Sequence, residues 1–176
     1  MAVPEAAFGK TVIASTSEKV QFRESMRLLA GAVCVIATEH NGARGGLTAT
    51  AVTSFTADPP QILLCVNRNA SAYPSLCESG KFTINLLREE NVFIAQRFAG
   101  LDGSKGTERF DGAKWEMMVT GAPALADSLA SIDCRLVELI ERNGHGLIIG
   151  SVVSTRIRGG DPLVYVRQNF HALKKL

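Results

Sequence analysis

Small side chains dominate residues 45–55, GGLTATAVTSF, and make this segment the part of the sequence best suited to hold a planar ring. Its alternation and its β-branched residues predict an extended strand. A strand that only filled a core would carry Val, Ile or Leu on its inner face, whereas this inner face is short and partly hydroxylic. A flat heteroaromatic cofactor could therefore lie against the backbone and take hydrogen bonds from it. The same pattern could instead fit the taper of a small barrel.

A polar run at residues 67–71, Asn-Arg-Asn-Ala-Ser, is suited to bind an anion. It lies where a strand predicted over residues 61–67 leads into a short helix that begins at Asn69. Free backbone N–H groups at a helix start favour negative charge, and the Arg68 guanidinium can bind a phosphate through two hydrogen bonds. Asn69 could instead only cap the helix, with Arg68 in solvent. Lys105, in a glycine-rich segment, could close over the same anion or simply be exposed.

His145 is the histidine with the most useful surroundings among the three in the chain. It follows Asn143-Gly144, a strong signal for a β-hairpin turn. Glycines beside an imidazole permit close approach by a ring-shaped ligand, although an ordinary turn histidine would look the same. His40 lies in another predicted turn, and His171 lies near the end of the chain.

Motifs of several enzyme classes are absent from the sequence. It has no GxSxG, HExxH or DxD pattern, so hydrolase chemistry and a metal site have little support. A Walker A motif is also missing. Gly100, Gly103 and Gly106 do not have the GxGxxG spacing and follow a predicted helix rather than a strand. A nucleotide would therefore have to bind outside a Rossmann fold.

Composition limits the remaining possibilities. The chain has 176 residues, 46% of them hydrophobic, which suits one core. A net charge of +2 gives no reason to expect nucleic acid or an acidic membrane as a partner. The N-terminus lacks the pattern of a signal peptide, and no apolar run is long enough for a spanning helix. The four cysteines form no CxxC pair and predict buried thiols in a reducing cytoplasm.

Hydrophobic periodicity and turn signals predict a mainly β chain with a few helices. We expect a flexible arm over residues 1–16 and a single domain over residues 17–176. The domain would begin with a helix capped by Ser17 that continues to residue 30. The other expected elements are strands over 33–38, 45–55, 61–67, 82–87, 132–141, 147–157 and 163–167, a helix over 89–98, and a mobile loop over 100–112. About seven strands with few helices favour a closed or nearly closed antiparallel barrel.

Together these segments resemble the short-chain flavin reductases, the small components of two-component flavin-dependent monooxygenases. The similarity is carried, in order, by GLTATAVTSFTADPP, CVNRNASAYP, FTINLL, QRFAG, SIDCRL, GHGLIIGSV and PLVYVRQNFHAL, and extends over residues 22–173. It implies an antiparallel Greek-key split barrel of the FMN-binding type, a homodimer, and reduction of FMN or FAD by NADH or NADPH.

The resemblance also implies roles for individual positions. Backbone along the isoalloxazine edge would come from the small-residue strand, the ribityl chain and phosphate would lie at residues 65–71, and His145 would contact nicotinamide. Many relatives carry an acidic residue before this histidine, where Gly144 stands here. The full set of expected binding residues is Leu47, Thr48, Ala49, Thr50, Thr53, Ser54, Cys65, Asn67, Arg68, Ser71, Phe98, Lys105, Tyr165 and Arg167.

The sequence leaves the electron acceptor open. Reduced flavin could pass to an oxygenase component, or the enzyme could be a corrin reductase that reduces Co(II) corrinoid to Co(I). A protein of another class, a non-enzymatic split barrel that only stores or senses flavin, is a further alternative. An open second face beside His145 favours catalysis, because a store has no need of one.

Overall fold

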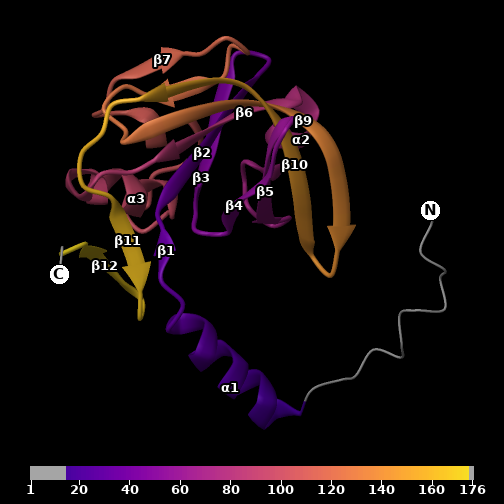
Figure 1. Cartoon of the computed structure of the whole chain (residues 1–176), viewed down its shortest axis with the longest axis vertical. Coiled ribbons are helices and arrows are strands. Elements are labelled where there is room, and N and C mark those ends of the chain that lie inside the picture. The colour runs from indigo at the N-terminus through magenta and orange to yellow at the C-terminus, as the bar shows by residue number, and fades with distance from the viewer. Residues whose placement is uncertain (1–14, 175–176) are drawn as a thin grey trace, which may run out of the picture.

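The computed structural model describes residues 15–174, which form a β-rich body with one helix standing off it (Figure 1). The expected arm over residues 1–16 therefore lies almost wholly outside the described residues. The helices are α1 (Thr16–Arg27), α2 (Tyr73–Ser79) and α3 (Val92–Phe98), with short 3-10 helices η2 (Glu89–Asn91) and η3 (Gly106–Phe110). The strands are β1 (Gly31–Ala32), β2 (Cys34–His40), β3 (Ala43–Ala49), β4 (Val52–Ala57), β5 (Pro60–Asn67), β6 (Lys81–Leu86), β7 (Trp115–Met117), β8 (Pro123–Leu125), β9 (Ala130–Arg142), β10 (His145–Ile157), β11 (Leu163–Val166) and β12 (Asn169–Ala172).

A seven-stranded antiparallel sheet, in the order β3-β2-β6-β9-β10-β5-β4, makes up most of the body. The mainly β architecture predicted from the sequence is confirmed. So is the hairpin between the two longest strands, β9 and β10, where Asn143 and Gly144 both adopt positive φ angles, 47° and 81°. These two angles are those of a tight turn that matches the twist of the strands.

The expected single strand over residues 45–55 is wrong. The chain leaves β3 after Ala49 and enters β4 at Val52, with Thr50 and Ala51 between them. β3 pairs with β2 while β4 pairs with β5, so the two strands form opposite edges of the same sheet. Side-chain alternation continues through the break, which explains why a pattern of period two did not reveal it. The short connection brings the two edges of the sheet together.

The N-terminal helix begins earlier and ends sooner than predicted. Ser15, rather than Ser17, caps it, because the Ser15 hydroxyl accepts from the Glu18 backbone while the Glu18 carboxylate accepts from the Ser15 N–H. None of its residues is buried among the described residues, and its aromatic residue Phe22 is 65% exposed. Figure 1 shows the helix projecting away from the body.

Three further differences lie around the sheet. The second helix begins at Tyr73 rather than Asn69, because residues 68–72 form turns. β1, β7, β8 and β12 were not predicted. β12 pairs with β11 after a turn in which Arg167 and Gln168, rather than glycines, take positive φ. The segment 100–112 contains η3 rather than being wholly irregular. There the Asp102 carboxylate accepts from Ser104 and Arg97, and these hydrogen bonds, those of Ser104 first, lower its pKa to about 2.

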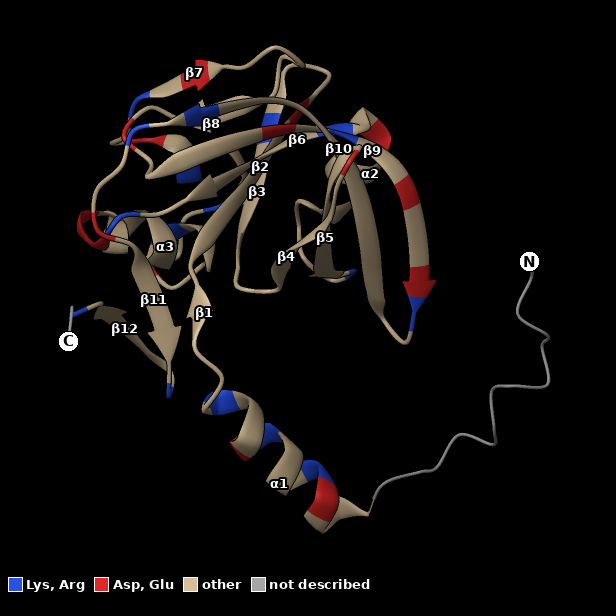
Figure 2. Cartoon of the chain, viewed as in Figure 1, with Lys and Arg blue, Asp and Glu red and all other residues tan. Residues whose placement is uncertain are grey.

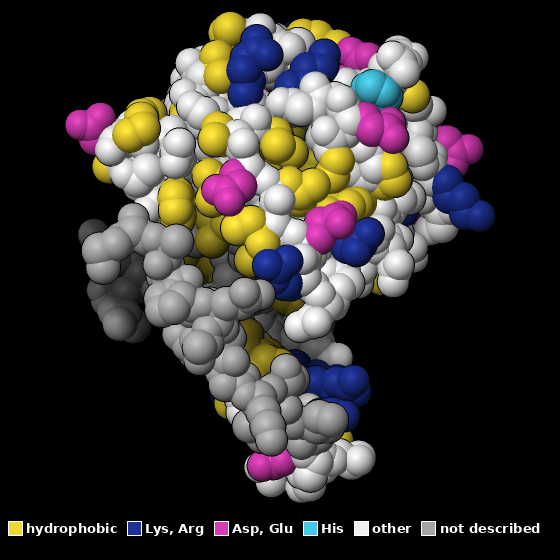
Figure 3. Space-filling model, turned by 90° about the vertical axis from the view of Figure 1, so that its right-hand side faces the viewer, with side chains coloured by type: hydrophobic (Ala, Val, Ile, Leu, Met, Phe, Trp, Pro, Cys, Tyr) yellow, Lys and Arg dark blue, Asp and Glu magenta, His cyan; other side chains and the backbone are white. Residues whose placement is uncertain are grey.

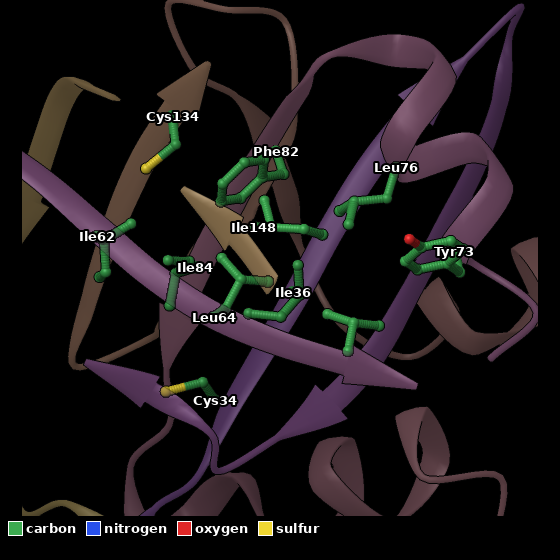
Figure 4. Packing of buried hydrophobic residues seen from close by; sticks show 11 residues of the cluster. Cys34, Ile36, Ile62, Leu64, Tyr73, Leu76, Phe82, Ile84, Cys134 and Ile148 are labelled. Atoms are coloured by element: carbon green, nitrogen blue, oxygen red, sulfur yellow. The ribbon is translucent and has the colours of Figure 1, made fainter. Parts of the chain in front are cut away.

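The core has an apolar part and a polar part. Ile36, Leu64, Phe82 and Ile148 are fully buried between the strands and pack together (Figure 4). On the other face of β6 lies the buried amide of Asn85, which connects several strands through its hydrogen bonds.

The Asn85 amide donates to the Val35 carbonyl and to Thr83, and its oxygen accepts from the Leu125 N–H and the Ser131 hydroxyl. Buried polar groups need such partners. β8 and β9 are thereby fixed against the central strands β2 and β6.

Replacing Asn85 with Ala leaves the buried Leu125 N–H and Val35 carbonyl without these partners. Because each unsatisfied buried group costs about 1–3 kcal/mol, we expect the free energy of unfolding in urea to fall by about 3 kcal/mol. Gln21→Ala, on the exposed surface of α1, is the control and should change it by less than about 0.5 kcal/mol. Equal, small effects of the two substitutions would contradict this role of Asn85.

Candidate functional site

A cavity of about 720 Å³ opens where the two edges of the sheet meet. Its volume lies within the range of roughly 300–1,000 Å³ that is usual for small-molecule and cofactor sites. β3, the β3–β4 connection, the end of β5, the following turns, α3, η3 and the start of β10 all contribute to it. The lining residues are Leu47, Thr48, Ala49, Thr50, Ala51, Cys65, Val66, Asn67, Asn69, Ala70, Ser71, Phe98, Ala99, Arg109 and His145.

The wall made by residues 47–51 is shaped by close packing behind it. A Cβ at Gly46 would come within 2.6 Å of the Phe98 ring, so this position admits only glycine without a shift of the ring. The Thr48 hydroxyl donates to the Ala95 carbonyl of α3 at 2.7 Å and so fixes β3 against that helix. β3 is an edge strand, and backbone groups along the free edge of such a strand have no strand partner. This wall is therefore smooth and offers backbone hydrogen-bonding groups.

The opposite wall joins the end of β5 to the β9–β10 hairpin. His145 pairs with Asn67 in the register of β10 and β5, and the Arg68 N–H donates to the Gly144 carbonyl at 3.0 Å. The Asn67 side chain accepts from the Asn69 N–H at 2.9 Å and folds the turn back toward the cavity. An exposed imidazole thus lies beside a set of amide and hydroxyl groups.

Several residues expected from the sequence are brought together here. Those that line the cavity are Leu47, Thr48, Ala49, Thr50, Cys65, Asn67, Ser71, Phe98 and His145. Thr53 and Ser54 do not; both are exposed on β4.

Arg68 and Lys105, the two expected anion-binding cations, also lie outside the lining. The Arg68 guanidinium instead pairs with the Glu141 carboxylate, with Nε 3.1 Å from Oε1. Lys105 precedes η3, and its backbone N–H donates to the Glu108 carboxylate at 3.0 Å.

Tyr165 lines a neighbouring recess of about 260 Å³. This recess shares Thr48, Ala49, Thr50 and Ala99 with the main cavity, and Phe170 of β12 packs against Tyr165 with ring centroids 5.2 Å apart. The Arg167 backbone N–H donates to the Arg27 carbonyl at the end of α1, at 2.7 Å. Tyr165 and Phe170 therefore lie next to the wall formed by residues 47–51, on the side of the neighbouring recess.

Arg109 is the lining residue that sequence reasoning missed most clearly. Its guanidinium donates to the carbonyls of Ser104 at 3.2 Å and of Gly46 and Phe98 at 3.3 Å. It holds the 100–112 segment against β3 and α3 and supplies the cation of the lining. No local pattern distinguishes it from other arginines, because its contact with Gly46 of β3 joins positions far apart in the sequence. Val66 and Ala99 were not singled out either. Ala51, Asn69 and Ala70 belong to the two runs singled out at 45–55 and 67–71 but were not among the expected binding residues.

The cysteines differ in their surroundings, and all four are free. Burial raises the pKa of the Cys34 and Cys134 thiols to about 12, so both stay protonated at neutral pH. Cys65 and Cys77 are only partly buried, which corrects the expectation that all four are buried.

Residues 15–174 hold neither a metal-binding cluster nor a membrane-spanning helix. These residues contain no group of three or more His, Cys, Asp or Glu side chains placed to hold a metal ion. In the same part of the chain no helix combines the length and apolarity needed to cross a membrane. Positions with Lys or Arg and positions with Asp or Glu are interspersed along the elements of the chain (Figure 2).

Known proteins are similar to this chain over most of its length. The family model described as flavin reductase like domain matches residues 26–174. The FMN reductase (NADH) RutF 2 of Methylorubrum extorquens (strain PA1) is 39% identical over 168 residues, which cover 93% of this chain and 96% of that protein. The FMN reductase (NADH) RutF of Pseudomonas syringae pv. syringae is 38% identical, with 92% and 89% covered.

Solved structures agree. Flavin reductase PheA2 superimposes with a TM-score of 0.82 at 30% identity, covering 89% of this chain and 98% of that one. BorF, the flavin reductase component of a bacterial two-component tryptophan halogenase, gives 0.81 at 27% identity, covering 90% and 99%. These structures confirm the split-barrel fold implied by the sequence motifs. With its family model matching nearly the whole described chain, the protein belongs to the flavin reductase like domain family.

Proposed function

We propose that this chain is an NADH-dependent flavin reductase that binds FMN in the 720 Å³ cavity. The observation that carries the proposal is the edge strand with small side chains facing a cavity whose other wall holds polar groups and His145. The similarity to FMN reductases (NADH) along almost the whole chain supports FMN over FAD and NADH over NADPH.

The lining fits a flavin on physical grounds. A tricyclic ring can lie against residues 47–51, because four of these five side chains are Thr or Ala and the free backbone edge can exchange hydrogen bonds with the pyrimidine part of the ring. Asn67, Asn69 and Ser71 lie at the other wall and can donate to the ribityl chain and the phosphate. Arg109 adds a positive charge to the same cavity.

Flavin, when bound, supplies the redox chemistry by accepting a hydride from the nicotinamide. The protein's own contribution is to bind, orient and exclude water rather than to transfer protons. Backbone N–H groups on the β3 edge would stabilise negative charge on the ring. His145, exposed at the start of β10 between Gly144 and Gly146, would position the nicotinamide.

The proposal extends to the cellular location of the protein and to the acceptor of its reduced flavin. Residues 17–176 would act as one domain in the cytoplasm and hand reduced flavin to an oxygenase component. An open loop over residues 100–112 would suit a large acceptor such as a corrinoid. Arg109 and the buried Phe110 instead fasten that segment to the body, so no specific observation favours the corrin reductase.

The central test is turnover. The purified chain should oxidise NADH when FMN is added, and His145→Ala should raise the KM for NADH by about tenfold, since a lost contact of about 1.4 kcal/mol has that effect. The Kd for FMN, measured by quenching of flavin fluorescence, should change by less than about twofold. His40→Ala is the matched control. No NADH oxidation with FMN, FAD or riboflavin would leave only flavin binding as the function.

A second test concerns the phosphate. Ser71→Asp places a carboxylate in the polar wall, and like charges repel, so the Kd for FMN should rise by about tenfold or more. Riboflavin lacks the phosphate and should bind with less than about a twofold change. Thr53→Asp adds the same charge outside the cavity and should affect neither ligand. Equal weakening of FMN and riboflavin by Ser71→Asp would place the phosphate elsewhere.

A homodimer is the further part of the proposal, and α1 is the surface that supports it. A groove of about 330 Å³ runs between α1 and the body, lined by Phe22, Met26 and Tyr165 among others. Phe22 and Met26 are 65% and 46% exposed, a large apolar exposure for a helix. Hydrophobic side chains also gather over the middle of the face shown in Figure 3.

Sedimentation equilibrium tests the dimer. The full chain should have twice the mass of one copy, and the double substitution Phe22→Asp with Met26→Asp should shift it toward the monomer, because two buried carboxylates are costly. Gln21→Asp, which adds a carboxylate on the opposite face of α1, should leave the dimer intact. A monomeric wild type at micromolar concentration would refute this part.

A further inference from the structure

One carboxylate oxygen joins three elements beside the candidate site. Oε1 of Glu141, near the end of β9, accepts a hydrogen bond from the Tyr73 hydroxyl at 2.9 Å. The same oxygen lies 3.1 Å from Nε of Arg68. Tyr73 is the first residue of α2, and Arg68 lies in the turn after β5. Glu141 itself does not line the cavity.

These three elements are the ones that place His145. Glu141 is paired across the hairpin with Gly146, the residue directly after His145. On the other side of the hairpin tip, the Arg68 N–H donates to the Gly144 carbonyl at 3.0 Å. The backbone on both sides of the imidazole is therefore connected, directly or through one pairing, to the Glu141–Arg68 pair.

Tyr73 adds a steric restraint. A Cβ at Gly146 would come within 2.4 Å of the Tyr73 hydroxyl and 2.7 Å of its ring, so the phenol lies directly against the hairpin backbone. The ring is 6% exposed, and Figure 4 shows it at the side of the apolar cluster. Burial, and then the hydrogen bond to Glu141, raises the pKa of this phenol above its usual value, so it remains a donor at neutral pH.

The energetic role of this group in folding is small. The side chains of Arg68 and Glu141 are 48% and 41% exposed, and exposed ion pairs contribute little to stability. These three side chains can matter more for the placement of His145 than for stability. A shift of about 1 Å in a positioning residue can lower a rate by about a hundredfold.

We propose that Glu141 is a positioning residue: with Tyr73 and Arg68 it holds the hairpin tip, and therefore the His145 imidazole, at the place in the cavity wall that a nicotinamide requires. The inference rests on the proposed function, because it assigns the nicotinamide side of the site to His145. It also gives Arg68 a role that differs from direct contact with a phosphate.

The experiment compares variants of the full chain. Glu141→Ala removes both interactions and should lower kcat/KM for NADH by about tenfold, with less than about a twofold change in the Kd for FMN. Glu141→Gln keeps an acceptor for Tyr73 and should restore most of the loss, whereas Tyr73→Phe should reproduce part of it. Glu138→Ala, an exposed residue of the same strand, should have no effect.

Hydrogen exchange of the flavin-free protein supplies a readout that needs no turnover. The Arg68 amide, which donates to Gly144, should exchange about fivefold or more faster in Glu141→Ala and at the wild-type rate in Glu138→Ala. Unchanged exchange would overturn the inference, as would equal losses for FMN and NADH, which indicate a general structural defect. If Glu141→Ala speeds exchange but the wild type oxidises no NADH, the hairpin restraint stands and the reductase proposal fails.

Discussion

The passage of the chain from β3 to β4 through Thr50 and Ala51 is the constraint on which the site depends. Those two strands are the opposite edges of the sheet, and only two residues connect them. The Cys65 N–H donates to the Ala51 carbonyl at 3.0 Å, which adds a hydrogen bond from β5 to the connection itself. Bringing the edges together leaves the free side of β3 facing the end of β5, and the cavity is the space between them.

Much of the fold could be predicted because its signals are local. Asn143-Gly144 fixed the hairpin, and alternating apolar residues located most of the strands of the large sheet. The break after Ala49 could not be predicted, since alternation continues through Thr50 and Ala51 while the hydrogen-bond partners change from β2 to β5. β12 was missed for a related reason: the turn before it uses Arg167 and Gln168 at positive φ, where glycine or asparagine is the usual signal.

The candidate site was likewise predictable where its signals are local and unpredictable where its contacts are long-range. The positions that line the cavity belong mostly to runs whose composition is unusual in itself, such as the small residues before Ala51. The partners of the arginines could not be predicted, because the charge of a side chain does not identify the group that it will contact. Arg68 meets Glu141, which is far away in the sequence, and Arg109 reaches the carbonyls of Gly46 and Phe98. Both outcomes depend on long-range packing that no spacing of residue types expresses.

The missing side chain at residue 46 has a practical consequence for protein engineering. Phe98 rests against that backbone, and the tolerance there is smaller than one methyl group. Mutant libraries aimed at bulkier ring systems would lose most members at this position to misfolding. Substitutions at Ala99, which lines both the 720 Å³ cavity and the neighbouring 260 Å³ recess, should be tolerated far more often.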